Sequence, residues 1–561
     1  MDRTRTLAAL ERGPYDLLVI GGGITGAGVA REASLRGFRV ALVEAHDFAS
    51  GTSSRSTKLI HGGLRYLKQL DFKLVAEAVA ERQLLLRMAP HLVEATPFLF
   101  PVYEGDPDSL LALRAGLVVY DLFARLRAAV PHRILEPQAV LAREPGLRRD
   151  DLVGGALYTD SRTDDARLTL AVLESATRYG ADVANYLAVE AFLHVRQADG
   201  RIAGVRVRDA LSGQTLEVRA QRVLAAVGPW ADVVRRLDDP AAASILRLTK
   251  GVHLTVERAR LPLRHAVVMR GRDRDRRMMF AIPRGGMTYL GTTDTDFDGE
   301  PGTAQVDAED VAYILDAANG WFPEARLTDA DVRSTWVGLR PLVRPPHQAS
   351  PSTVSRDYQL FRSPSGLVTV GGGKLTAFRA MAEHIVNVLL PGSDGRRHRP
   401  ASSGPLPGAD GPLPRADDWQ RLARRTGATP EQVWAWCGPY GSNVGSVAAR
   451  LPTDASGDPG LDWHRAMTRY AVEQEMAQHV EDVYRRRTDL MLFSRGNGRA
   501  WLEPLAAEMA ARLGWSAERT AEEVRHTEDA IDGMFGYRGA RAAVATTDGR
   551  LAASRRSAAA M

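Results

Sequence analysis

The chain has 561 residues, 45% of them hydrophobic and 25% charged, so it is long enough for two or three globular domains with a large core. Its 73 basic and 68 acidic residues leave a net charge of +5, a mild excess that suits an anionic surface or substrate and does not indicate nucleic acid. The single cysteine, Cys437, excludes an internal disulfide and a cysteine-cluster metal site, so we expect a reducing compartment and no metal.

Residues 1–14 predict a short N-terminal extension without a secretory signal. No stretch of the sequence approaches the roughly 18 uncharged apolar residues that a membrane-spanning helix needs. We therefore expect a cytoplasmic protein, or one that is attached to a membrane from one side.

Residues 15–44 predict a nucleotide-binding βαβ unit. An apolar strand at Leu17–Ile20 precedes a helix rich in Ala and Val, and a second strand follows at Arg39–Val43. Between the first strand and the helix lie the glycines of a GxGxxG fingerprint, Gly21, Gly23 and Gly26. In such units the first glycine permits a tight turn, the second lets backbone N–H groups approach a diphosphate, and the third lets the helix pack closely on the strand.

Two further positions belong to the same unit. Thr25 lies inside the glycine loop, and Glu44 ends the second strand 18 residues beyond Gly26. A carboxylate at that place can accept hydrogen bonds from both hydroxyls of an adenosine ribose. Strand, helix and acid in this register predict dinucleotide binding.

Residues 51–66, GTSSRSTKLIHGGLRY, contain five Ser or Thr residues and a Gly-Gly pair, without helical or strand periodicity at their start. Hydroxyls and backbone N–H groups of this kind suit a second phosphate and the polar edge of a flavin, and the glycines let a ring lie against the chain. The alternative is a solvated serine-rich loop. The cofactor contacts that we predict here are Thr52, Ser53, Ser56, Thr57, Lys58, Leu59, His61, Gly62 and Gly63.

Residues 110–127 predict a strongly apolar helix with Arg114, Asp121 and Arg125 on one stripe, which fits a membrane-surface helix and a buried core helix equally well. Further along, residues 202–208, 248–256 and 289–293 are alternating or β-rich. They predict a second, mainly antiparallel sheet that covers the cofactor. We place this cap at approximately residues 85–160 and 245–345, inserted into a cofactor-binding domain over residues 15–390.

Two more segments run from a strand into glycines. Residues 222–230, RVLAAVGPW, end in Gly-Pro-Trp, and residues 367–379, LVTVGGGKLTAFR, pass through three glycines into a helix. Both deliver backbone to the crevice at the carboxyl ends of the strands, where open α/β sheets bind ligands. The cofactor contacts that we predict here are Gly228, Trp230, Gly373, Lys374, Leu375 and Thr376.

The remainder predicts a Pro- and Gly-rich linker at 391–414, a helical C-terminal domain at 415–538 and a flexible tail at 539–561. Within the helical domain, residues 470–492 form the clearest amphipathic segment. The predicted fold class is α/β: a Rossmann-type cofactor-binding domain with an inserted, mainly antiparallel substrate-binding sheet, and a helical C-terminal domain.

Nine motifs carry a resemblance to a known family. They are GGGITGAG at 21–28, TSSRSTKLIHGGLRYL at 52–67, DDARL at 164–168, GPW at 228–230, KGVHL at 250–254, GTTD at 291–294, GLRPL at 338–342, SRDY at 355–358 and GGKLTAFR at 372–379. With these motifs, residues 15–390 resemble the FAD-dependent glycerol-3-phosphate dehydrogenases, respiratory enzymes of the D-amino-acid-oxidase-like flavoprotein superfamily. The helical C-terminal part is similar in kind and less specific.

The resemblance implies FAD as cofactor and oxidation of sn-glycerol 3-phosphate to dihydroxyacetone phosphate, with hydride transfer to flavin N5. It also implies a membrane quinone as electron acceptor and peripheral attachment to the inner face of the cell membrane. Oxygen is the alternative acceptor. A homodimer is compatible with the sequence, although no pattern in it indicates the oligomeric state.

The charge of the implied substrate can be compared with the cations of these motifs. A phosphate monoester carries about −1.5 to −2 at neutral pH, so its pocket needs more than one cation. Charge-assisted hydrogen bonds contribute roughly 1.5 to 3 kcal/mol each, so three donors would outweigh the desolvation of the phosphate. The substrate-binding residues implied by the resemblance are Arg65, Tyr66, His253, Arg340, Arg356 and Lys374.

Three of these residues are also catalytic candidates. His253 is the candidate base, because a neutral histidine has a suitable intrinsic pKa for taking the hydroxyl proton. Arg340 would polarise the developing alkoxide, and Lys374 would stabilise reduced flavin and contact the phosphate. The alternative for His253 is a hydrogen-bonded core residue within an apolar strand.

Three other functions are compatible with parts of the pattern. A flavin oxidase of an amine or a 2-hydroxy acid would share the fold but would need fewer cations for its carboxylate substrate. A flavin-binding scaffold without catalysis would not need the cationic and histidine positions. An NAD-linked dehydrogenase would share the fingerprint, but residues 51–66 and the glycine junction before Lys374 suit an isoalloxazine better.

Overall fold

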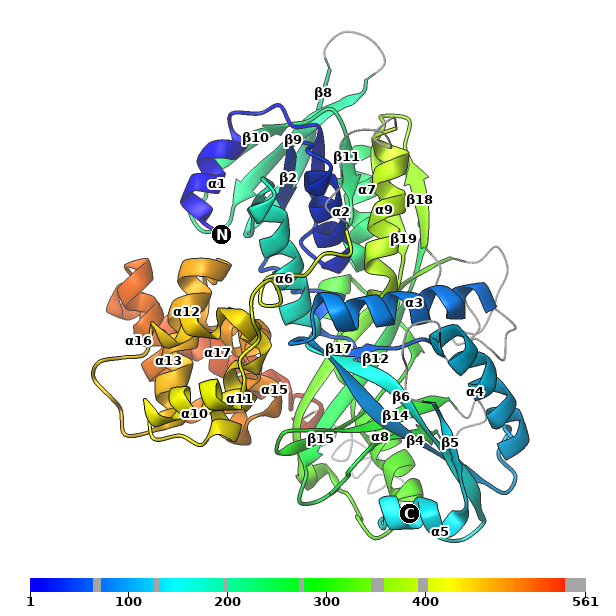
Figure 1. The fold of residues 1–561 in the computed structure, drawn as a ribbon. Helices are drawn as coiled ribbons and strands as arrows, with labels where there is room; N and C mark the ends of the chain where they lie inside the picture. Colours follow the sequence, from blue (N-terminus) through cyan, green and yellow to red (C-terminus); the bar gives the residue numbers. More distant parts are fainter. Residues whose placement is uncertain are drawn as a thin grey trace, which may run out of the picture.

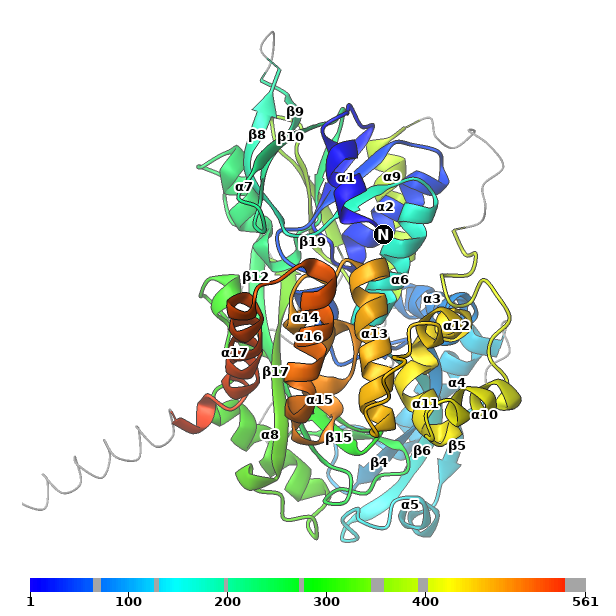
Figure 2. The same ribbon diagram turned by 90° about the vertical axis from the view of Figure 1, so that its left-hand side faces the viewer.

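The computed structural model describes residues 1–63, 72–125, 131–195, 200–271, 277–344, 358–391 and 402–539. It confirms the predicted fold class: a Rossmann-type domain, a large mainly antiparallel sheet and a helical C-terminal part lie side by side (Figures 1 and 2). Within these ranges, no helix combines the length and the apolar character that crossing a membrane requires.

The cofactor-binding half is built on a six-stranded sheet. Strands β19, β11, β1, β2 and β7 run parallel, and β18 pairs antiparallel at the edge. In sheet order the strands are β18 (Tyr358–Arg362), β19 (Val368–Gly372), β11 (Val223–Ala225), β1 (Leu17–Ile20), β2 (Val40–Val43) and β7 (Asp182–Ala184).

Both faces of this sheet are covered, which explains why its strands are continuously apolar. On one face lie α2 (Ile24–Leu35), α6 (Asp165–Arg178) and α9 (Phe378–Leu389). On the other lies a three-stranded sheet of β8 (Leu187–His194), β9 (Ile202–Asp209) and β10 (Thr215–Arg219). Since successive side chains of a strand point to opposite faces, Leu17 packs in the first core and Leu18 in the second.

The position of β9 corrects one expectation. Residues 202–208 were predicted to join the cap sheet, but they form the middle strand of the three-stranded sheet. The alternation in this segment is that of any half-buried strand, and nothing in it specifies which sheet the strand joins. Helix α1 (Arg3–Leu10) lies beside β7, and α7 (Ala231–Asp238) lies beside β8.

The cap is a ten-stranded sheet in which, among the described strands, only the β4–β13 pair is parallel. Its strands are β3 (Leu59–Ile60), β4 (Val93–Tyr103), β5 (Arg133–Leu135), β6 (Leu152–Thr163), β12 (Leu246–Glu257), β13 (Ala266–Arg270), β14 (Met278–Arg284), β15 (Met287–Gly291), β16 (Thr295–Asp296) and β17 (Val332–Val343). The helices associated with it are α3 (Phe72–Met88), α4 (Leu110–Arg125), α5 (Pro137–Arg143) and α8 (Ala308–Trp321).

Helix α4 is the helix predicted at residues 110–127, but its charged residues do not share one environment, because Arg114 is exposed and Asp121 is buried. Asp121 is buried and accepts hydrogen bonds from the backbone N–H and the Nδ1 of His132. The exposed face of α4 carries Leu111, Val118 and Leu122 together with Arg114. This helix lies on the opposite side of the molecule from the C-terminal helices (Figure 1).

The C-terminal helices are α10 (Ala416–Arg424), α11 (Pro430–Cys437), α12 (Val444–Ala448), α13 (Pro459–Glu475), α14 (Val480–Asp482), α15 (Leu490–Phe493), α16 (Leu502–Leu513) and α17 (Ala517–Gly533). Residues 470–492 are therefore not one helix: Met476 adopts a left-handed conformation (φ 55°) that ends α13. A π-helical turn, Val483–Arg487, follows α14. Figure 2 shows α13, α14 and α16 below the cofactor domain, and α15 packs against β17.

Candidate cofactor and substrate site

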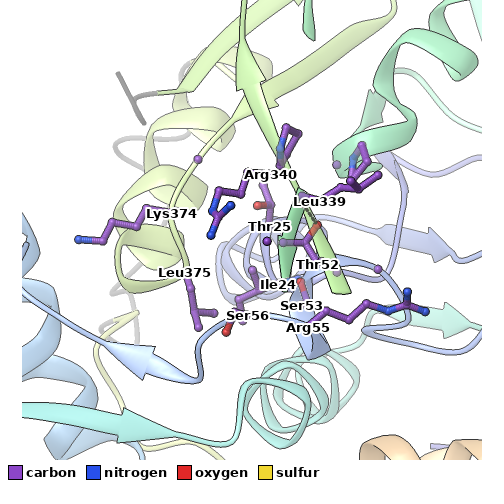
Figure 3. Close-up of a pocket in the computed structure, with 18 of the residues that line it drawn as sticks. Ile24, Thr25, Thr52, Ser53, Arg55, Ser56, Leu339, Arg340, Lys374 and Leu375 are labelled. Carbon is purple, nitrogen blue, oxygen red and sulfur yellow. Dashed lines mark hydrogen bonds between the residues drawn. The ribbon is translucent and has the colours of Figure 1, made fainter. Parts of the chain in front are cut away.

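A cavity of about 460 Å³ lies between the six-stranded sheet and the cap. It is lined by the carboxyl ends of β1, β2, β11 and β19, and by residues of the cap strands. This is the crevice in which open α/β sheets bind ligands. Figure 3 shows the part of it around Arg340, with the glycine loop and the hydroxyl-rich segment facing the same space.

Gly21 and Gly26 have the geometry that a tight turn and close helix–strand packing require, and Gly23 faces the cavity. Gly21 has φ +110°, and a Cβ there would lie 2.6 Å from the carbonyl oxygen of Ala226. A Cβ on Gly26 would lie 2.0 Å from the carbonyl oxygen of Gly21, so helix and strand meet at that point. Gly23 caps α2 and lines the cavity, where a Cβ would approach only the Ser53 Oγ. Thr25 also lines the cavity, whereas Gly26 packs behind it.

Glu44 lies at the cavity wall, at the end of β2. Its carboxylate accepts hydrogen bonds from the N–H of Gly22 (2.6 Å) and the N–H of His46 (2.9 Å). Burial raises the pKa of Glu44, partly offset by these two backbone donors. The carboxylate is thus held beside the glycine loop, as an adenosine-binding acid requires.

The hydroxyl groups of residues 52–57 tie this segment to its surroundings. Thr52 donates to the carbonyl of Leu339 in the cap (2.7 Å), and the Ser53 Oγ accepts from the N–H of Ile24 at the start of α2 (2.9 Å). The segment therefore bridges the glycine loop and the cap. The predicted residues of this segment that line the cavity are Thr52, Ser53, Ser56, Thr57, Leu59, His61 and Gly63.

Two predicted cofactor contacts in this segment do not line the cavity. The ammonium of Lys58 is buried and paired with Asp165 (2.5 Å), whose other oxygen accepts from Ser56. Gly62 is buried against helix α4, where a Cβ would lie 2.3 Å from the Tyr120 Oη. Both residues therefore pack on the side of the segment that faces away from the cavity. The partner of Lys58 was not predicted, because Asp165 in the DDARL motif is distant in the sequence.

The junction after β19 faces the hydroxyl-rich segment. Gly373 has φ +112°, and Lys374 donates from Nζ to the carbonyl of His61 (3.0 Å). Thr376 donates to the same carbonyl and accepts from the His61 N–H, both at 3.3 Å. The predicted residues Gly373, Lys374, Leu375 and Thr376 all line the cavity, as do Gly228 and Trp230 after β11.

Arg340 extends from β17 toward the middle of the site (Figure 3). Its guanidinium donates to the Asp294 carboxylate (3.1 Å), to the Thr292 Oγ1 (3.0 Å) and to the Thr293 carbonyl (3.1 Å). It lies over Gly251 on the neighbouring strand, where a Cβ would come within 2.6 Å of it. Asp294 therefore positions this cation, a role that sequence reasoning missed because the acid and the arginine are 46 residues apart.

His253 lines the cavity from β12, next to β15 and β17. Its Nε2 is 2.9 Å from the Thr57 Oγ1, and its ring stacks on Trp336 at 4.8 Å between centroids. Burial lowers the pKa of His253 well below its usual value, and the charges of Arg340 and Lys58 lower it further. The imidazole is therefore neutral near pH 7, and its buried Nδ1 has no hydrogen-bond partner among the described residues.

Two features of the cavity were not predicted. The first is an apolar and largely aromatic region on four cap strands, called the aromatic region below, which no local motif could indicate. It consists of Phe98, Phe100, Tyr158, Val268, Met278 and Phe280. The second is Arg55, whose pKa burial lowers to about 10, together with the charges of Arg485 and Arg486 in the C-terminal part. Three expected substrate-binding residues, Arg65, Tyr66 and Arg356, lie outside the described residues.

The site combines a dinucleotide crevice with a mainly antiparallel cap that places neutral His253 and Arg340 over the crevice. These features define the class of the protein as a flavin-dependent oxidoreductase. Comparison with known proteins gives the family. The FAD dependent oxidoreductase family matches residues 16–387, and the C-terminal domain of alpha-glycerophosphate oxidase matches residues 401–520.

Relatives over the whole chain agree with this assignment. The chain is 36% identical to an aerobic glycerol-3-phosphate dehydrogenase of Staphylococcus haemolyticus, over 93% of this chain and 95% of that protein. It is also 36% identical to the protein of that name in Bacillus subtilis, over 94% and 96% of the two chains. Among solved structures, the glycerol-3-phosphate dehydrogenase of Bacillus halodurans, complexed with FAD, superimposes with a TM-score of 0.77 at 34% identity, over 95% and 97% of the two chains.

The chain therefore belongs to the FAD-dependent oxidoreductase family and, within it, to the glycerol-3-phosphate dehydrogenases, as its motifs predicted. FAD is the cofactor of this family, and the residues present fit it: the open face of Gly23 and the Glu44 carboxylate lie where a diphosphate and a ribose need them.

Proposed function

We propose that the protein oxidises sn-glycerol 3-phosphate to dihydroxyacetone phosphate and passes the electrons to a membrane quinone. The observation that carries the proposal is the joint position of His253 and Arg340, a neutral base and a cation, over the cavity that begins at the glycine fingerprint. The names of the relatives support the choice of substrate.

FAD would be held by the residues on the sheet side of the cavity. Gly23, Thr25 and Ser53 would hold the diphosphate, Glu44 would bind the ribose, and Lys374 and Thr376 would bind the flavin, because all six line the cavity. When bound, FAD supplies the acceptor for the hydride that leaves C2 of the substrate.

The cap residues would bind and orient the substrate. Arg340 is fixed by Asp294 and Thr292, so it can offer its charge to the substrate without losing its own orientation. His253 can take the hydroxyl proton because it is buried in its neutral form, and the Thr57 hydroxyl and the Trp336 ring hold the imidazole in place.

The test compares substrates on the holoenzyme in two assays. With a quinone analogue as acceptor, glycerol 3-phosphate should be turned over, whereas glycine, sarcosine and 2-hydroxyglutarate should not. Without an acceptor, glycerol 3-phosphate should bleach the flavin absorbance anaerobically, and the other three compounds should not. Arg340→Met should lower kcat/KM for glycerol 3-phosphate while FAD stays bound. Turnover of an amine alone would overturn the proposal in favour of an oxidase, and an unreactive flavin would favour a scaffold.

Attachment to the inner face of the membrane is supported by helix α4. Its outer face exposes 76% of Leu111, 54% of Val118 and 62% of Leu122, an apolar row of the kind that interfacial helices bury in lipid. Its inner side packs Leu113 and Leu117 into the same core as the aromatic region of the cavity. A quinone in the membrane would therefore meet the enzyme on the side where the cavity is aromatic.

Homodimer formation stays a prediction, which analytical ultracentrifugation can test.

A further inference from the structure

The C-terminal helical part is joined to the cofactor domain by a buried ionic cluster next to the cavity. Asp47 follows Glu44 by three residues, and its carboxylate is bound by Arg486 and by both terminal nitrogens of Arg487. Arg486 also donates to Asp482 (2.7 Å). The side chains of these four residues are at most 6% exposed, so the cluster is shielded from water.

A second loop of the cofactor domain joins the same cluster. Tyr186, which follows β7, donates from Oη to Asp482 (2.7 Å), and its ring packs on His479 at 4.9 Å between centroids. The Asn185 side chain donates to Asp47 (3.2 Å) and to the carbonyl of Met476 (2.9 Å). Residues 476–487 therefore hold the loops that follow two neighbouring strands, β2 and β7.

These two loops also form one wall of the cavity. The N–H of Tyr186 donates to the His46 carbonyl (3.0 Å), and the N–H of Leu187 donates to the Glu44 carbonyl (2.7 Å). Glu44, His46 and Leu187 all line the cavity. The backbone around the ribose-binding acid is thus connected to the C-terminal part through a short chain of hydrogen bonds.

The ion pairs of the cluster fix the relative position of the groups that they join. Burial alone would raise the pKa of Asp47, but Arg487 and Arg486 lower it below its usual value, so the carboxylate is charged. A buried ion pair adds little stability compared with an apolar pair of the same shape, whereas removing one partner leaves an uncompensated charge. The directed contacts of such a pair specify one geometry of the groups that it joins.

We propose that the C-terminal helical part retains the cofactor: Arg486 and Arg487 hold Asp47, which keeps the loop of Glu44 and His46 in its ribose-binding geometry. Asp47 is a positioning residue that acts through Glu44, so the inference rests on the proposed place of Glu44 in the FAD site. Because binding equilibria are reciprocally linked, FAD in turn strengthens the contact between the two parts.

The test measures the release of FAD from the holoenzyme, followed by the rise of flavin fluorescence, in Asp47→Asn. The matched control is Asp489→Asn, which removes a carboxylate from another contact of the C-terminal part, the 2.7 Å pair with Arg284 of the cap. We expect release at least tenfold faster in Asp47→Asn, about 1.4 kcal/mol, and within twofold of wild type in Asp489→Asn. In wild type, flavin release and unfolding followed by circular dichroism should coincide on heating, and in Asp47→Asn release should come first.

Tyr186→Phe gives a milder form of the same test if Asp47→Asn does not fold. It removes only the hydrogen bond to Asp482 and should release FAD about threefold faster. Release within twofold of wild type from a folded Asp47→Asn, or from Tyr186→Phe, would overturn the inference. Wild-type protein that holds no FAD would instead overturn the proposed cofactor site.

Discussion

Gly251 has no side chain, and this leaves room for the guanidinium of Arg340. Substituting alanine at residue 251 therefore tests the cationic site without removing any charge. A Cβ at residue 251 would lie 2.6 to 2.8 Å from three atoms of the Arg340 guanidinium. These atoms are the far end of a flexible side chain, so we expect the arginine to move while the strand stays in place. The movement would pull the guanidinium off Asp294 and Thr292.

The expected cost follows from the contacts that the displaced cation can no longer offer to the substrate. A charge-assisted hydrogen bond contributes roughly 1.5 to 3 kcal/mol, so Gly251→Ala should lower kcat/KM for glycerol 3-phosphate by about 10- to 150-fold. Gly251 does not have positive φ, so the alanine should change the free energy of unfolding by no more than about 1 kcal/mol.

Steady-state kinetics and denaturant unfolding would measure both quantities. The matched control is Gly286→Ala in the turn between β14 and β15, where a Cβ meets nothing within 4 Å; its kcat/KM should be that of wild type. In a protein that already carries Arg340→Met, Gly251→Ala should have little further effect on kcat/KM. Both substitutions act on the same interaction, that of the Arg340 guanidinium with the substrate. A folded Gly251→Ala enzyme with kcat/KM within twofold of wild type, or fully additive effects, would refute the reasoning.

Three other outcomes are expected. His253→Asn should slow flavin reduction by about 100- to 10,000-fold in stopped-flow experiments. Because burial lowers the pKa of His253, the rate of flavin reduction in wild type at saturating substrate should stay level as the pH falls through about 6.5 and decline only at lower pH; a decline centred at about 6.5 would contradict the buried base. Asp165→Asn leaves the Lys58 ammonium buried without its anion. Urea denaturation should show a free energy of unfolding that is lower by about 3 to 5 kcal/mol. A loss below about 1 kcal/mol would show that the fold does not need this ion pair. Val118→Asp should reduce co-flotation with anionic phospholipid vesicles and leave turnover with a soluble dye unchanged, whereas unchanged flotation would exclude α4 as the membrane contact.

Much of the site could be predicted because its residues form local patterns. Gly21, Gly23 and Gly26 have roles that depend only on a strand, a turn and a helix adjacent in sequence. The hydroxyl-rich segment and the glycine junction before Lys374 could be assigned for the same reason. Local patterns did not predict the position of Lys58. Its place in a cofactor motif suggested a ligand contact, but its ammonium is paired with buried Asp165, 107 residues away.

The sequence by itself determined the class of cofactor and the strand on which the candidate base His253 lies, because hydrophobic period and glycine spacing act within a few residues. The tertiary structure alone decided which polar groups meet. His253 reaches Thr57, 196 residues away, and Arg487 reaches Asp47, 440 residues away. Contacts at such separations follow from how sheets and helices pack, and buried polar groups must find partners wherever packing places them.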